Sequence, residues 1–150
     1  MPAPETQAGF TLRLTRTFNA PRERVFRAWT DPEQLKQWWG PKDFDCIEAQ
    51  SDPRPGGKYR ITIRGREKGE VYTAYGEYKE VAPPARLVCT WRWEQWDAAM
   101  WETLLTVEFR DLGGATELAL THERFRGESM RGEHGEGWAS CLECLAEHLG

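Results

Sequence analysis

Two cysteines and two histidines near the C-terminus are the side chains best suited by type to metal or redox chemistry. Cys141 and Cys144 have the spacing of redox and zinc pairs, and His134 and His148 flank them. At about 100° of turn per residue, however, the four side chains do not converge on one helical face, and no second such pair is present. We therefore expect no metal and no cofactor, and we interpret Cys141 as a small core residue.

His122 and His134 indicate a different kind of site. His122 is in phase with Leu118 and Leu120 of a predicted strand and should point inward, whereas His134 falls on the inner flank of the last predicted helix. Three interpretations stay open. The pair provides polar groups of one ligand pocket, consists of hydrogen-bonded histidines at the rim of a sheet, or, as the least favoured, belongs to a metal site.

Other catalytic and nucleotide-binding patterns do not rise above background. The glycine-rich run from Asp52 to Gly57 precedes a predicted strand rather than a helix, so it indicates a turn and not a phosphate loop. No Ser-His-Asp order or paired-carboxylate pattern stands out. The acidic residues of the C-terminal segment fall mostly on the solvent-exposed face of the predicted helix. The sequence therefore names no catalytic residue and favours a protein that is not an enzyme.

The eight tryptophans are the unusual feature of this 150-residue chain. Trp29, Trp38 and Trp39 crowd the segment between Pro21 and Pro41. Because each indole buries about 150 to 250 Å², such rings can simply fill a core. Alternatively, several line an apolar pocket, with these three as a wall or lid at its mouth. The expected ligand-contacting residues are Trp29, Trp38, Tyr59, Ile61, Trp91, Trp93, Trp101, Leu105, His122, His134, Trp138 and Cys141.

The elements that position these residues can be predicted from periodicity and turn chemistry. Apolar and polar residues alternate over 10–18, which predicts a strand. Pro21, and then Asp31 followed by Pro32, are typical of helix starts, so two short helices should precede Gly40. A period of two then returns and predicts six strands, at residues 43–50, 57–65, 71–82, 86–95, 100–111 and 115–123.

The C-terminal segment returns to helical spacing. Trp138, Leu142, Leu145 and Leu149 share one stripe and predict a long amphipathic helix that lies across the sheet. Its early turns contain Gly132, Gly135 and Gly137, each of which weakens a helix by roughly 1 kcal/mol relative to alanine. The predicted order of elements gives an α+β fold with an antiparallel sheet.

Composition and charge limit the possible partners. The net charge of −4 and the pI of about 5.5 disfavour nonspecific binding to nucleic acid. No stretch approaches 18 apolar residues, so we expect no membrane span and a cytoplasmic location. Residues 1–8 are interpreted as a loose leader and residues 9–150 as a single domain.

Four separated motifs, spread over about residues 9–149, resemble one family. They comprise Ala20, Pro21, Val25, Trp29 to Pro32, Leu35, Trp38, Trp39 and Pro41; Pro55 to Gly57; GEYKEVAPPARLVCTW at 76–91; and His134, Gly137, Trp138, Leu142 and Leu145. The chain is similar to the SRPBCC superfamily, in the branch related to the C-terminal domain of the activator of heat-shock-protein ATPase. That resemblance implies the helix-grip fold of the birch-pollen allergen and START domains, in which a curved seven-stranded antiparallel sheet wraps a long C-terminal helix.

Members of this superfamily often enclose an apolar cavity between sheet and helix, but they differ in ligand. Three functions are therefore considered. The first is noncatalytic binding of a small hydrophobic or aromatic ligand, the second is a chaperone-cofactor-like interaction domain in the stress response, and the third is a polyketide cyclase-like enzyme. The expected partner is a small apolar ligand, with a chaperone or another protein as the alternative, and the chain is expected to be a monomer or homodimer.

Overall fold

The computed structural model describes residues 9–96 and 102–150, in which it places seven strands and three helices. The predicted leader at 1–8 and the predicted site residue Trp101 lie outside the described residues. The elements are β1 (Phe10–Phe18), α2 (Arg22–Thr30), α3 (Pro32–Trp38), β2 (Phe44–Ser51), β3 (Lys58–Gly65), β4 (Val71–Ala82), β5 (Arg86–Trp93), β6 (Thr103–Asp111), β7 (Thr116–Phe125) and α4 (Glu128–Leu149).

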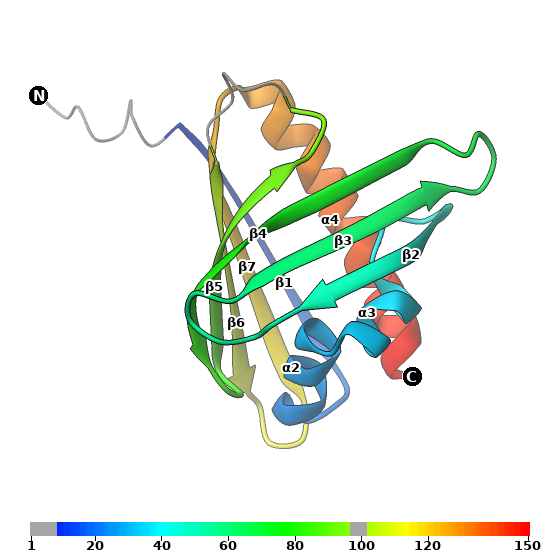
Figure 1. Ribbon diagram of the computed structural model, residues 1–150. Coiled ribbons are helices and arrows are strands. Elements are labelled where there is room, and N and C mark those ends of the chain that lie inside the picture. The colour runs from blue at the N-terminus through cyan, green and yellow to red at the C-terminus, as the bar shows by residue number, and fades with distance from the viewer. Residues whose placement is uncertain (1–8, 97–101) are drawn as a thin grey trace, which may run out of the picture.

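The strands form one antiparallel sheet in the order β1-β7-β6-β5-β4-β3-β2. Figure 1 shows that the sheet curves and that α4 runs along its inner side, with α2 and α3 near one end. Helix α4 contacts β1 and β7, α3 contacts β2, and α2 contacts β6. The predicted α+β helix-grip architecture is confirmed.

The predicted break between the two short helices is confirmed at Asp31. Its backbone N–H still donates to Arg27 and ends α2, while its carboxylate accepts a hydrogen bond of 3.0 Å from the N–H of Glu33 and caps α3. Pro32 occupies the first turn of α3, where a missing N–H costs nothing. One residue thus terminates one helix and begins the next.

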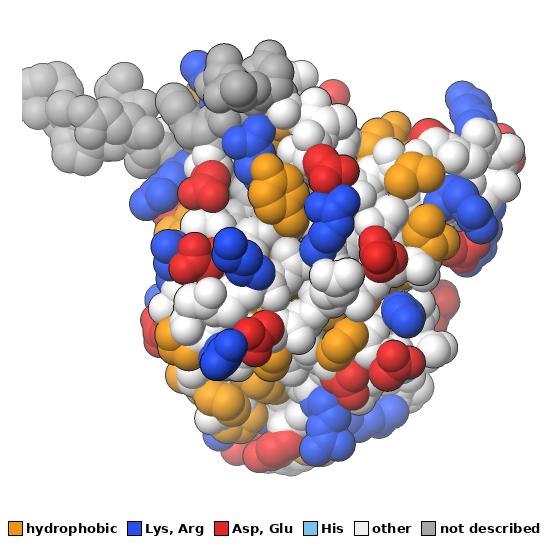
Figure 2. Space-filling model, in the orientation of Figure 1, with side chains coloured by type: hydrophobic (Ala, Val, Ile, Leu, Met, Phe, Trp, Pro, Cys, Tyr) orange, Lys and Arg blue, Asp and Glu red, His pale blue; other side chains and the backbone are white. Residues whose placement is uncertain are grey.

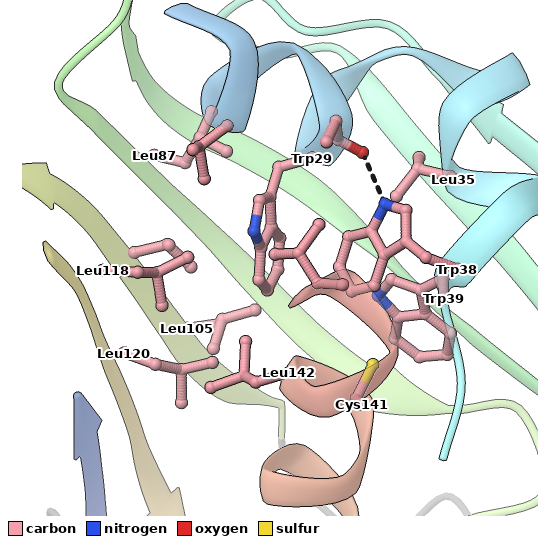
Figure 3. Packing of buried hydrophobic residues seen from close by; sticks show 14 of the residues in the cluster. Trp29, Leu35, Trp38, Trp39, Leu87, Leu105, Leu118, Leu120, Cys141 and Leu142 are labelled. Carbon is pink, nitrogen blue, oxygen red and sulfur yellow. Dashed lines mark hydrogen bonds between the residues drawn. The ribbon is translucent and has the colours of Figure 1, made fainter. Parts of the chain in front are cut away.

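The core lies between the inner face of the sheet and the apolar stripe of α4. Buried side chains on the sheet include Ile61, Ile63, Trp91, Leu105, Val107, Phe109, Leu118 and Leu120, and those on the helix include Trp138, Cys141, Leu142, Leu145 and Leu149. Figure 3 shows Trp29, Trp38 and Trp39 extending from the helical segment toward α4, which carries Cys141 and Leu142.

The segment after α3 is tied directly to α4. The N–H of Gly40 donates to Cys141 Sγ at 3.3 Å, and the N–H of Lys42 donates to Ser140 Oγ at 2.7 Å. Gly40 has a φ of 126°, which favours glycine, and a Cβ there would lie 3.2 Å from Ile63 Cγ2. These contacts hold residues 39–42 against the helix and so fix one side of the site described next.

Within the described part of the chain, none of the helices has the length and apolar character that a membrane crossing requires.

Candidate functional site: an aromatic cavity beside α4

A cavity of about 260 Å³ lies between α4, strands β2 to β5 and the segment that follows α3. Gln95 and Glu133 line it and are exposed, so they mark its mouth. The complete lining is Trp39, Pro41, Phe44, Ile63, Tyr72, Trp91, Trp93, Gln95, Glu133, His134, Gly137, Trp138 and Cys141. The apolar character of the cavity is that of a small-molecule site, and its volume lies just below the usual range of about 300 to 1,000 Å³.

Aromatic rings at steep mutual angles form the walls. Trp39 lies 5.9 Å from Trp138 between ring centroids at 88°, and Trp93 lies 5.9 Å from Tyr72 at 64°. Trp91 packs against Trp93 at 4.9 Å and 81°. Such edge-to-face contacts are favourable beyond the area that they bury. The rings therefore hold one another in place around the space.

His134 contributes a neutral imidazole to this wall. Its Nε2 accepts a 3.0 Å hydrogen bond from Trp93 Nε1–H, which can only donate. Its Nδ1 lies 2.8 Å from the carbonyl oxygen of Met130, so Nδ1 carries the proton and donates. Burial lowers the pKa of His134, opposed by the Met130 hydrogen bond and by the charge of Glu133. Both ring nitrogens are thus occupied.

His122 lies behind Trp138 and is not part of the cavity lining. Trp138 Nε1–H donates to His122 Nδ1 at 3.0 Å, and His122 Nε2 lies 2.7 Å from Thr103 Oγ1. Because Thr103 donates its hydroxyl proton to the carbonyl of Trp91 at 2.6 Å, His122 Nε2 must be the protonated nitrogen. Burial, and secondarily His134, hold the pKa of His122 well below its usual value. His122 supports the rings from behind as a satisfied core histidine.

A second, deeper space of about 30 Å³ lies on the other side of Trp39, Trp91 and Trp138, which line both spaces. Trp29 also lines it, and the buried Trp29 Nε1 has no hydrogen-bond partner among the described residues. A volume of this size can hold about one water molecule. The three shared indoles therefore separate the open cavity from a small interior void.

The predicted site residues fall into groups according to these spaces. Trp91, Trp93, His134, Trp138 and Cys141 line the open cavity, whereas Trp29, Tyr59, Ile61 and Leu105 line the deeper void together with Trp91 and Trp138. Trp38 lines neither, because its indole N–H donates to the carbonyl of Ala28 at 2.9 Å and its ring packs on Trp29 at 5.1 Å (Figure 3).

Several lining residues were absent from the predicted set. Phe44 and Tyr72 are 6.0 Å apart between ring centroids although they belong to different strands. Tyr72 pairs with Ile63 across the β3–β4 ladder and therefore shares its face. The same period of two that placed Ile63 inward could have indicated Tyr72, and also Phe44, which alternates with Asp43 and Asp45. Gln95 carries no comparable signal.

The cysteines are arranged as separate thiols. Cys141 is buried and accepts the hydrogen bond from Gly40, and burial raises the pKa of its thiol. Cys144 is only partly buried. Within residues 9–96 and 102–150, no cluster of three or more histidine, cysteine or acidic side chains is positioned to bind a metal ion.

We expect removal of metal ions to leave the fold intact. Dialysis against a strong chelator should not change the midpoint or cooperativity of thermal unfolding, since a structural metal site would couple binding to folding. Circular dichroism melting before and after dialysis measures this. Loss of the cooperative transition, with recovery on addition of zinc, would show that the prediction is wrong.

Comparison with known proteins places this geometry in a wider group. Residues 19–150 match the family model described as Activator of Hsp90 ATPase homolog 1-like protein. A protein of Silicibacter pomeroyi has a similar solved structure, with a TM-score of 0.82 and 30% identity over 93% of this chain and 97% of that chain. For a protein of Chromobacterium violaceum, the TM-score is 0.80 and the identity 29%, over 92% and 96% of the two chains.

A third structure, CalU16 of Micromonospora echinospora, is 25% identical, with a TM-score of 0.70 over 93% of this chain and 76% of that chain. A search of curated proteins found no match.

Proposed function

The chain belongs to the Activator of Hsp90 ATPase homolog 1-like family, and from that premise we propose that it binds a small apolar or aromatic ligand without transforming it. The observation that supports the proposal is the open cavity of about 260 Å³ with an aromatic lining. A core of the same composition could have closed on itself, because indoles pack well against one another. Here the rings instead contact each other around a space.

The polar groups of the cavity favour binding over catalysis. A general acid or base needs a ring nitrogen or carboxylate that can reach the reacting atom. Both nitrogens of His134 already have partners in the protein, at 3.0 Å and 2.8 Å. Glu133 is exposed at the mouth rather than directed to an enclosed centre. This arrangement weighs against the cyclase-like alternative.

The surface gives less support to the interaction-domain alternative. Among the described residues, the exposed large hydrophobic side chains are Phe10, Ile47, Val71 and Leu112, on β1, β2, the start of β4 and the β6–β7 turn. On the face seen in Figure 2, hydrophobic side chains are interspersed with charged ones. Partner-binding surfaces are more often contiguous apolar patches.

Substitution of Gly137 by leucine should abolish ligand binding while the fold is kept. Gly137 lines the cavity, and a Cβ at this position would have no heavy atom within 4 Å. A leucine side chain can therefore occupy part of the cavity without a clash. Leucine also favours a helix by nearly 1 kcal/mol over glycine, so stability should not fall. The neutral fluorescent probe 1-aminoanthracene, followed by its own emission and by tryptophan quenching, should bind the unaltered protein with micromolar affinity, about −8 kcal/mol.

Gly132→Leu is the matched control. Gly132 lies on the same helix and is also free of neighbours within 4 Å, but it is absent from the cavity lining. Bound probe should raise the melting temperature of the unaltered protein and of Gly132→Leu, and not that of Gly137→Leu. Equal binding to both variants, or no binding to the unaltered protein, would contradict the proposal.

A further inference from the structure

The charges and hydrogen-bond donors around the cavity suggest which ligands it accepts. Among the described residues of the lining, Glu133 is the only charged side chain, and none is a lysine or an arginine. His134 is neutral by its hydrogen-bond pattern, with Nε2 accepting from Trp93. An anionic ligand would therefore find no positive charge within the described lining, and burial of an unpaired charge is costly.

Two of the indole N–H donors in the aromatic walls are already used within the protein. Trp93 Nε1–H donates to His134, and Trp138 Nε1–H donates to His122. Two of the indoles thus use their polar atoms within the protein and present the rest of the ring to the space. Ligand carboxylates and phosphates need such donors, so their binding is disfavoured by the same contacts that order the rings.

Aromatic faces and a carboxylate together match a positively charged group. Trp39, Trp138, Tyr72 and Trp93 all line the space, and the ring planes differ in orientation, with 88° between Trp39 and Trp138 and 64° between Tyr72 and Trp93. The face of an aromatic ring carries negative potential, and methylated ammonium groups bind in cages of this type. Glu133 at the mouth adds a full negative charge, which already acts on the neighbouring His134.

We propose that the preferred ligand is a small organic cation, an aromatic molecule that carries a methylated ammonium group. This inference rests on the proposed ligand-binding function and specifies the chemical class of that ligand. The ammonium group lies among the indole and phenol rings on the side of Glu133, and the aromatic part of the ligand fills the remaining apolar space. Selectivity comes from the charge, since a neutral molecule of the same shape contacts the same walls.

Displacement of bound 1-aminoanthracene compares ligands at this one cavity. Phenyltrimethylammonium and tert-butylbenzene have nearly the same shape, and only the first is charged. We expect phenyltrimethylammonium to displace the probe at a concentration about tenfold lower than tert-butylbenzene, a ratio within the range of desolvated cation–π contacts. Benzoate, which carries the opposite charge, should not displace the probe. Isothermal titration with phenyltrimethylammonium gives a direct dissociation constant.

Two glutamates of α4 provide the variant and its control. Glu133→Gln should weaken phenyltrimethylammonium about threefold and leave tert-butylbenzene unchanged, whereas Glu136→Gln, at an exposed position outside the lining, should change neither. If tert-butylbenzene displaces the probe as well as the cation does, or benzoate displaces it, the cation proposal is wrong and the ligand-binding function stands. If 1-aminoanthracene itself fails to bind, the proposed function falls and this inference falls with it.

Discussion

Replacement of Trp138 by alanine is expected to lower the free energy of unfolding by about 3 to 5 kcal/mol, as for other large core truncations. The ring stacks on Trp29 at 5.9 Å and 27°, and it lies nearly perpendicular to Trp39. Because Trp138 lines both the open cavity and the deeper void, its loss would join the two spaces. It would also remove the donor to His122 Nδ1 and leave a buried acceptor without a partner.

Chemical denaturation of three variants separates these contributions. Trp138→Phe keeps an aromatic ring but loses the indole N–H, so its loss of stability should be intermediate, on the order of 1 to 3 kcal/mol. Ala139→Gly changes an exposed position on the same helix and should cost only the helix propensity of glycine, about 1 kcal/mol. A denaturation midpoint for Trp138→Ala within error of the unaltered protein would contradict the central role of this residue.

Much of the fold could be predicted from local sequence patterns. Asp31 and Pro32 mark a helix boundary by capping chemistry, and that boundary is where the structure has it. Strand β4 spans Val71–Ala82, the same residues that the alternation predicts, because turn residues delimit it on both sides. Strand β5 ends at Trp93, two residues before the predicted end, where the ladder gives way to a turn.

The composition of the site was harder to predict, and Trp38 and Trp39 show why. Helix α3 ends at Trp38, and Trp39 is the cap residue with an extended backbone, φ −69° and ψ 128°. Its φ is still helical and its N–H still donates to Leu35, so the Trp39 side chain points about 100° around the helix axis from Trp38. Trp39 lines the cavity, whereas Trp38 packs on Trp29. Periodicity indicates which residues are apolar and on which face they lie, but not which of two adjacent buried indoles borders a cavity.

The neighbours of the cavity also depend on tertiary geometry. Phe44 at the start of β2 meets Tyr72 of β4 across the curved sheet, at 6.0 Å between rings. Glu133 lies on the solvent-exposed face of α4, as the sequence indicates, and yet it lines the mouth of the cavity. A polar residue at a rim has the same periodicity as any surface residue, so the site could be identified only once the sheet and helix were placed.

The stability of the protein is expected to fall as the pH is lowered below about 6.5, with His122 as the main titrating group. Burial lowers the pKa of His122 in the folded state well below the value near 6.5 that an unfolded chain shows. Above that pH both states are neutral at His122, and stability does not depend on its titration. Below it, the unfolded chain takes up a proton that the folded protein excludes, which costs about 1.4 kcal/mol for each pH unit.

The hydrogen-bond pattern explains why the folded state excludes this proton. A protonated His122 would present an N–H at Nδ1 to the N–H of Trp138, which cannot accept. The ring centroid of His134 lies 6.0 Å from that of His122, and burial lowers the pKa of His134 as well. Protonation of His134 Nε2 would remove the acceptor for Trp93 Nε1–H, so His134 adds to the loss of stability at low pH. Denaturation at a series of pH values from 8 to 5 therefore measures how steeply the free energy of unfolding changes with pH.

His122→Gln should flatten that slope, whatever its effect on stability at neutral pH, because glutamine does not titrate. His148→Gln is the matched control, since His148 is only partly buried near the end of α4 and contacts Gln34 at 3.2 Å. Burial also lowers the pKa of His148, but its smaller burial predicts a smaller change in slope. A slope that His148→Gln abolishes and His122→Gln preserves would assign the acid sensitivity to the helix end and remove His122 from this role.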